Sequence, residues 1–330
     1  MAAMVTRREP GLRSGRIITI GVSPAWDISC RSAGLEWGCH VDIDEQVVRP
    51  AGKAMNVSYA LAWLGRPNIA AGLWGREDCD QMQGAVRRLG GLIEPRMTPV
   101  EGRTRQNITV VDTRGRREMH LRRKSGLASE RGLRSLDANL RKLVHRGDTC
   151  IFAGVMPGGD LLEHIVDLVR TCRRAQARIL VDTYGPPLAG VVGAGLPWLI
   201  SPNVAELCEL LGRKVQNTPA RLAAAARTLR DKVETVLVSR GARGAVLVSK
   251  KGVWTGRPKT RRKVLSTVGC GDYLLAGFLA GFDKTRDPRV ALATGLKVAA
   301  ARAWGWTETK RWPQVEKEIE VSIIVEDSRV

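Results

Sequence analysis

Short apolar runs alternate with helical patterns along this chain of 330 residues, and this alternation constrains its fold most strongly. The runs typical of buried strands are Arg16–Val22, Thr149–Val155, Ile179–Asp182, Trp198–Ser201, Thr235–Ser239 and Ala245–Ser249. The stretches with helical spacing are Asn56–Leu64, Leu161–Cys172, Ala220–Lys232, Gly271–Phe282 and Pro288–Trp304. Strands that alternate with helices form a mostly parallel sheet whose two faces are covered by those helices. We therefore expect one α/β domain over residues 1–330.

Two polar segments interrupt the alternation. Residues 31–49 are polar and contain only short strand patterns, and residues 107–121 are typical of a hairpin with a turn at 113–116. A strand pattern that is both short and polar cannot contribute much to a large buried sheet. We expect these two segments to form a small separate sheet beside the main core.

Composition excludes several classes of protein. No apolar run approaches the roughly 18 residues of a membrane-spanning helix, and the basic, polar start of the chain lacks the apolar stretch of a secretory signal. We expect residues 1–15 to be a flexible tail. The seven cysteines include no Cys-x-x-Cys pair, and none of the four histidines lies within metal-ligand spacing of a cysteine. This pattern predicts reduced thiols in a cytoplasmic protein, with neither a disulfide framework nor a zinc site.

The net charge of +20 favours anionic ligands. Phosphorylated substrates and nucleic acids both satisfy this preference. The basic residues are spread along the chain and form no long basic tail, so we do not expect a nucleic-acid partner.

The most informative motif is Ser266–Asp272, which leads directly into an apolar helix. Gly269, Cys270 and Gly271 allow consecutive backbone N–H groups to converge beside a helix N-terminus, which is a favourable site for a phosphoryl group. Asp272 in the first turn can then take a proton from an attacking hydroxyl. The helix N-terminus also predicts a lowered pKa for the Cys270 thiol, and the alternative is a buried, inert cysteine. The alternative is an aspartate that caps a helix after an ordinary glycine turn.

Two further motifs supply polar groups near strand ends. Asp27 follows the first expected strand, and open α/β sheets bind ligands at the carboxyl ends of their strands. Gly52 permits close backbone approach, while Lys53 and Asn56 supply hydrogen-bond donors at the start of a helix. The alternatives are a turn-forming aspartate and a simple helix cap.

Two motifs in the second half of the chain are open to both a functional and a structural interpretation. Asn203 and Glu206 have the spacing to face a hydrated Mg²⁺, but they also have the spacing of a capping box. Ser239, Gly241 and Gly244 are typical of a loop at the edge of a nucleotide, and equally of a tight hairpin turn.

In order and spacing these motifs resemble those of the ribokinase-like (PfkB) carbohydrate kinases, over roughly residues 17–303. Within that family the likeness is closest to 1-phosphofructokinases and tagatose-6-phosphate kinases. The matching stretches are SPAWD (23–27), AGKAMNVSYALAWLG (51–65), GRTRQNITVVD (102–112), AGVMPGG (153–159), SPNVAEL (201–207), VSRGARGAVLV (238–248) and STVGCGDYLLAGFLAG (266–281). The resemblance implies a Rossmann-like, mostly parallel sheet flanked by helices. It also implies a small β-sheet lid formed by residues 27–49 and 96–124, through which two subunits pair as a homodimer.

The resemblance also implies a role for each site residue. Asp272 matches the base, with the Gly269–Gly271 backbone as the anion hole for the transferred group. Asp27, Gly52 and Asn56 match contacts to sugar hydroxyls, while Lys53 and Arg105 match contacts to a phosphate already on the sugar. Asn203 and Glu206 match an indirect, water-mediated network around Mg²⁺. Ser239, Gly241 and Gly244 match the nucleotide loop.

The implied reaction is transfer of a phosphoryl group from ATP, with Mg²⁺, to a hydroxymethyl group of a sugar phosphate of the fructose-1-phosphate or tagatose-6-phosphate type. One alternative is a kinase of an unphosphorylated sugar or a nucleoside. Another is a weakly active relative whose basic surface binds nucleic acid or a regulatory partner. Departures from the family pattern, such as Ser201 in place of lysine and Cys270 in place of alanine, leave the kinase class intact and the exact sugar open.

Overall fold

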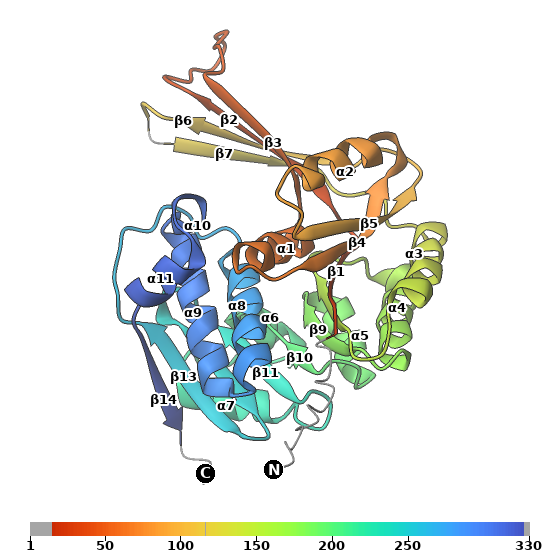
Figure 1. Ribbon diagram of the computed structural model, residues 1–330, viewed down its shortest axis with the longest axis vertical. Coiled ribbons are helices and arrows are strands. Elements are labelled where there is room, and N and C mark those ends of the chain that lie inside the picture. Colours follow the sequence, from red (N-terminus) through yellow and green to blue (C-terminus); the bar gives the residue numbers. More distant parts are fainter. Residues whose placement is uncertain (1–14, 116, 327–330) are drawn as a thin grey trace, which may run out of the picture.

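The computed structural model describes residues 15–115 and 117–326 (Figure 1). The expected flexible tail therefore lies outside the described residues, apart from Gly15. Within the described part of the chain, no helix is long and apolar enough to cross a membrane.

The larger of two sheets has ten strands among the described residues, in the order β14-β13-β12-β11-β10-β9-β8-β1-β4-β5. The strands from β5 to β11 run parallel, and β12, β13 and β14 add an antiparallel edge. Their bounds are β1 Ile17–Gly21, β4 Asn68–Gly75, β5 Ile93–Val100, β8 Thr149–Ala153, β9 Arg178–Asp182, β10 Leu199–Ile200, β11 Thr235–Ser239, β12 Ala245–Ser249, β13 Gly252–Pro258 and β14 Val321–Glu326. The predicted α/β class with a mostly parallel sheet is confirmed.

Helices cover both faces of this sheet. Because successive strand residues point to opposite faces, Ile18 and Ile20 pack in one apolar cluster and Ile17 packs in another. The first cluster is completed by α3 Glu130–Leu143, α4 Leu162–Arg174, α5 Gly185–Gly193, α6 Val204–Leu210 and α7 Pro219–Arg227. The second is completed by α1 Lys53–Trp63, α8 Cys270–Thr285 and α9 Pro288–Ala303. The remaining helices are α2 Cys79–Arg87, α10 Trp306–Thr309 and α11 Trp312–Glu318.

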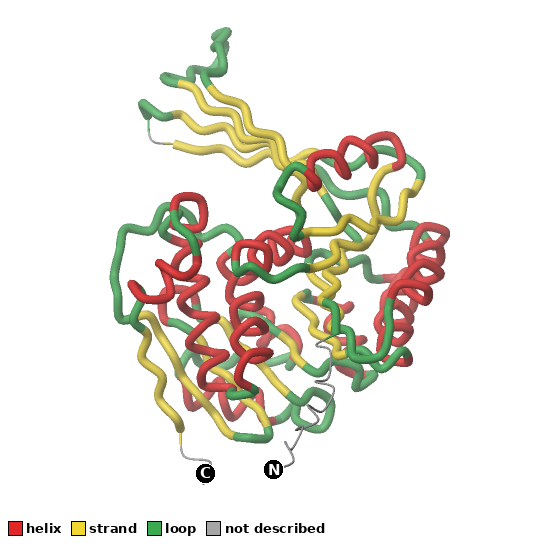
Figure 2. Tube along the Cα trace, in the orientation of Figure 1, coloured by secondary structure: helices red, strands yellow, loops and turns green. Residues whose placement is uncertain are grey.

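The smaller sheet projects from one end of the molecule, as Figure 2 shows. Its strands, in the order β3-β2-β6-β7, are β2 Ala25–Ser32, β3 Glu45–Ala51, β6 Gln106–Asp112 and β7 Arg117–Arg122. The sequence placed the second lid segment at residues 96–124, but residues 96–100 belong to the larger sheet. The reason is that β5 stays paired with β4 until Val100 opposite Gly75.

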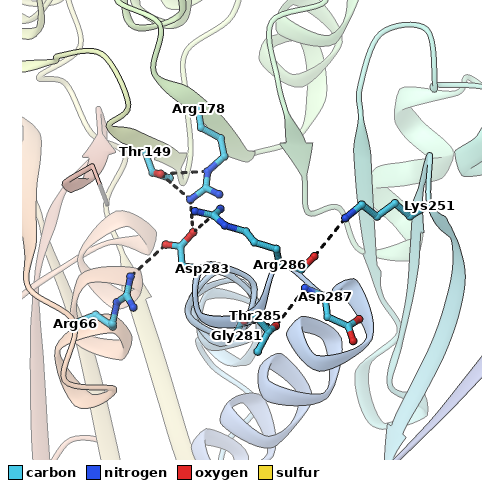
Figure 3. A network of polar contacts seen from close by, with 9 residues as sticks. All are labelled: Arg66, Thr149, Arg178, Lys251, Gly281, Asp283, Thr285, Arg286 and Asp287. Atoms are coloured by element: carbon cyan, nitrogen blue, oxygen red, sulfur yellow. Dashed lines mark hydrogen bonds and ion pairs between the residues drawn. The ribbon is translucent and has the colours of Figure 1, made fainter. Parts of the chain in front are cut away.

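A buried carboxylate near the end of α8 joins three elements of the fold (Figure 3). Asp283 accepts hydrogen bonds from Arg178 Nη2 at 2.6 Å, Arg66 Nη2 at 3.2 Å and Arg286 Nη1 at 3.4 Å. Arg178 is the first residue of β9, and Arg66 follows α1 closely in the sequence. The side chain of Asp283 is only 7% exposed. This network therefore fixes α1, β9 and α8 relative to one another at one end of the sheet.

We expect Asp283→Ala to lower the free energy of unfolding by about 3 kcal/mol, because it leaves partly buried arginines without their counter-charge. The measurement is urea denaturation followed by circular dichroism. The matched control is Asp167→Ala, which breaks an exposed ion pair with Arg170 and should cost less than about 1 kcal/mol. Equal losses in the two variants would contradict a structural role for the Asp283 network.

Candidate active site

The first turn of α8 lies against the first turn of α1. Asp272 is 3% exposed, and its Oδ2 accepts a hydrogen bond of 2.7 Å from Asn56 Nδ2. Gly269, directly before α8, has a φ of 79°, a left-handed conformation that favours glycine. A Cβ added to Gly269 would lie 3.7 Å from both Asn56 Nδ2 and Asp272 Oδ2. The structure thus brings the expected base, its glycine turn and Asn56 together.

The surroundings of Asp272 make its carboxyl unusually basic. Burial raises the pKa of Asp272 and the nearby Asp182 raises it further, while Lys53, Asn56 and Arg302 lower it, for a value of about 7. A carboxyl with a pKa near neutrality can accept a proton from a hydroxyl under physiological conditions.

Lys53 lies between two carboxylates. Its Nζ is 3.0 Å from Oδ1 of Asp182, the last residue of β9. Burial lowers the pKa of Lys53, but Asp182, Asp272 and Glu206 together raise it well above its usual value. Lys53 therefore remains charged. The sequence reasoning missed Asp182, although the rule that selected Asp27, a carboxylate at the end of a strand, would have selected it as well.

The smaller sheet supplies a second group of polar side chains. Asp27 on β2 is paired in register with Asn107 on β6, and Asn107 Nδ2 donates to Asp27 Oδ1 at 2.9 Å. The Oδ1 of Asn107 is buried and has no hydrogen-bond partner. Gly52 has a φ of 118° and lies against this region, since an added Cβ would be 3.5 Å from Pro24 Cα.

Arg105 is a partly buried cation held by carbonyl groups. Its guanidinium donates to Arg123 O at 2.8 Å, Pro24 O at 3.2 Å and Ser23 O at 3.4 Å. Burial lowers the pKa of Arg105, and Asp27 partly opposes this effect. Among the described residues no carboxylate forms an ion pair with Arg105. Its guanidinium is therefore available to an anionic ligand.

Asn203 and Glu206 form the capping box that the sequence left open as an alternative. Asn203 Oδ1 accepts from the backbone N–H groups of Ala205 and Glu206, and Glu206 Oε2 accepts from Asn203 N at 2.8 Å. Burial raises the pKa of Glu206. Glu206 in turn raises the pKa of Lys53, so its carboxylate lies near the site. In the described part of the chain, no group of three or more His, Cys, Asp or Glu side chains is arranged to hold a metal directly.

The backbone geometry of the turn also explains the glycines of the expected nucleotide loop. Gly241 begins the turn Gly241–Arg243 between β11 and β12, and a Cβ on Gly244 would be 1.9 Å from Gly256 O. Ser239 pairs with Asn203 in an isolated bridge, which places this turn beside the start of α6.

The pKa of the Cys270 thiol is shifted in the direction opposite to the prediction. Burial raises the pKa of its thiol, and Asp272 raises it too, while Arg302 lowers it. The prediction of a lowered pKa was wrong because desolvation of the thiolate outweighs the favourable helix terminus. Its neighbour Gly271 is exposed, and a Cβ there would meet no atom within 4 Å. Cys270 and Gly271 can therefore contribute to a ligand site mainly through their backbone.

Arg302 on α9 is a second residue that the sequence reasoning missed. Its Nε donates to Val268 O at 3.2 Å and its Nη1 to Glu308 Oε1 at 3.0 Å. The side chain is 14% exposed and lies over the ring of Tyr273. It therefore adds a positive charge beside the glycine turn. No local motif marks Arg302, because only the packing of α9 on α8 brings it there.

A buried carboxyl at a helix N-terminus, a glycine turn and the two nearby cations Lys53 and Arg302 at the edge of a mostly parallel α/β sheet are typical of one class, the phosphotransferases with an alcohol acceptor. Residues 20–303 match the model of the pfkB family carbohydrate kinases. The chain belongs to this family and is a carbohydrate kinase, for which ATP is the phosphate donor.

Similar proteins agree with this assignment. The chain is 31% identical to the 1-phosphofructokinase of Rhodobacter capsulatus over 287 residues, covering 85% of this chain and 89% of that protein. It is 26% identical to the 1-phosphofructokinase of Haemophilus influenzae over 284 residues, covering 86% and 90%. The structure of phosphofructokinase-2 from Escherichia coli in complex with fructose-6-phosphate shares the fold, with a TM-score of 0.81, 21% identity and coverage of 92% and 97%.

We expect kcat/KM to rise with pH and to level off above about pH 7, because the ionised form of Asp272 is the base and burial raises its pKa to about 7. Asn56→Ala removes a hydrogen bond that lowers this pKa, so the rise should move to higher pH. Asp182→Asn removes a neighbouring negative charge, so the rise should move to lower pH. The measurement is ADP release across pH 5 to 9. A profile that is unmoved in both variants would exclude Asp272 as the titrating base.

Proposed function

We propose that this kinase transfers the γ-phosphoryl group of ATP to a hydroxymethyl group of a sugar that already carries a phosphate, of the fructose-1-phosphate type. The observation that carries the proposal is Arg105, a partly buried cation without a carboxylate partner beside Asp27. A phosphate on the sugar would supply the missing counter-charge. The relatives named 1-phosphofructokinase support the same substrate class.

The residues of the chain divide the reaction between them. Asp27 and Asn107 orient the sugar, since Asp27 offers acceptors to its hydroxyl groups. Asp272 takes the proton of the attacking hydroxyl, and Asn56 holds its carboxylate in place. The backbone N–H groups at the start of α8 and the charge of Arg302 stabilise the negative charge on the group in transfer.

A magnesium ion would screen the phosphates of ATP. The donor set fits an ion that keeps most of its water, because Glu206 is near Lys53 but the described residues around it include no cluster of three His, Cys, Asp or Glu side chains. Asn203 and Glu206 would therefore act through water, as well as capping α6.

The alternatives explain fewer features. A kinase of an unphosphorylated sugar or a nucleoside would leave Arg105 without an anion. A weakly active binding protein would have no use for a buried carboxyl whose pKa is about 7.

All seven cysteines are free thiols, which supports a cytoplasmic location.

The smaller sheet, β3-β2-β6-β7, serves in this proposal as a lid over the sugar. It carries Asp27 and Asn107, and Arg105 directly precedes β6. Its strands also expose apolar side chains, with Val47 46%, Val48 45% and Leu121 49% exposed. A small sheet with exposed apolar residues needs cover. We propose that a second copy of the chain provides it, which makes a homodimer through the lids.

We expect ADP release across a panel of sugars and sugar phosphates to be fastest with a phosphosugar, and to be abolished to background in Asp272→Asn. Arg105→Ala should raise KM for the phosphosugar by about tenfold to 100-fold, as expected for a lost charged hydrogen bond. KM for the free sugar should change little. The matched control is Arg103→Ala, an exposed arginine two residues away. Equal effects of Arg105→Ala on both substrates would contradict the proposal.

We expect Leu121→Asp to convert the dimer into monomers, because it places a charge on the apolar surface of the lid. Sedimentation velocity measures the change. The control is Ile324→Asp on β14, an apolar residue 61% exposed at the edge of the larger sheet. A wild-type chain that sediments as a monomer, or a Leu121→Asp variant that stays dimeric, would contradict pairing through the lids.

A further inference from the structure

A basic cavity of about 310 Å³ lies at the end of the larger sheet opposite the candidate active site. Its lining comes from the segments that lead into β9, β10 and β11, together with Lys250 after β12. Arg178 begins β9 at the cavity, and Asp182 ends β9 in the active site. Four residue steps of a strand separate the two places by about 13 Å. The cavity is therefore distinct from the site of phosphoryl transfer.

The lining of this cavity carries more positive than negative charge. Its charged members are Arg173, Arg178, Arg230, Lys232 and Lys250 against Asp231 and Glu234. Of these seven side chains, only Arg178 forms an ion pair with any described residue, and its partner Asp283 lies outside the lining. The charges of the other four cations are therefore not cancelled by ion pairing within the described structure.

Arg178 is a fixed point in this cavity. It donates to Asp283 at 2.6 Å and to Thr149 Oγ1 at 2.8 Å (Figure 3). Its guanidinium also stacks 4.9 Å from the ring centre of Trp198. The single carboxylate of Asp283 also serves Arg66 and Arg286, so it does not neutralise all three arginines. An arginine that is held in place in advance loses little freedom when it binds a ligand.

We propose that this cavity binds a small phosphorylated anion. Arginine and lysine are the side chains that recognise phosphate groups, arginine through its planar fork and lysine as a point charge. The volume lies at the lower end of the range for small-molecule sites, about 300 to 1,000 Å³, and leaves no room for a polymer. The many charged side chains disfavour an apolar ligand. This second site is independent of the proposed substrate.

The test is lysine footprinting of the full chain by acetylation and mass spectrometry, with inorganic pyrophosphate as the probe and no magnesium. At ten times the dissociation constant, acetylation of Lys232 and Lys250 should slow by about tenfold. Lys142 and Lys214, which are exposed elsewhere, should not change at that concentration.

A pair of variants with the same loss of charge completes the test. Arg173→Ser combined with Arg230→Ser should abolish the protection of Lys232 and Lys250. Arg131→Ser combined with Arg289→Ser, at exposed positions outside the cavity, should preserve it. Equal protection of all lysines would show only a diffuse counter-ion atmosphere and would overturn the proposal. The absence of protection at Lys232 and Lys250, or equal loss in both double variants, would overturn it as well.

Discussion

Two buried carboxylates, Asp182 and Asp272, lie near a single lysine, Lys53. The arrangement of the site depends on this excess of negative over positive charge. Burying an ionised carboxylate is costly unless it is paired. Lys53 pairs with Asp182 at 3.0 Å, so Asp272 must rely on the hydrogen bond from Asn56 and on more distant charges. Burial and the nearby Asp182 consequently raise its pKa to about 7, a value that suits the base proposed above. The ion pair thus leaves Asp272 without a cation of its own among the described residues.

The fold meets this requirement by fixing both ends of the same three elements. At one end, α1, β9 and α8 carry Asn56, Asp182 and Asp272. At or just after their other ends, the Asp283 network joins the same three elements. Between these ends α8 packs closely on α9. A Cβ on Gly277 would be 2.8 Å from Val298 Cβ, so only glycine permits this approach. The same close packing carries Arg302 to the glycine turn.

The sequence predicted the elements that have a strong local signal. The central strands and the start of α8 were foreseen because apolar runs and a glycine before an apolar helix are local patterns. β5 was assigned in part to the lid because the lid segment 96–124 was taken from the family resemblance, and the pairing of β5 with β4 is visible only in space. Arg302 was missed because its partner Val268 lies more than thirty residues away in the sequence. Asp182 carried a local signal at the end of β9, but its pairing with Lys53 is visible only in space. The direction of the Cys270 pKa was wrong because local reasoning cannot measure desolvation.

Arg105 says more about the substrate than Lys53 does, because the two cations differ in their partners. Lys53 already has its counter-charge in Asp182, so any ligand phosphate must compete with a pair at 3.0 Å. Arg105 has only carbonyl oxygens as partners, and burial already lowers its pKa. Carbonyl dipoles orient a guanidinium but leave its net charge in place, so Arg105 would attract the phosphate of the proposed substrate. A partly buried cation without a counter-charge costs stability in the free enzyme, and the anionic substrate proposed above would recover that cost on binding.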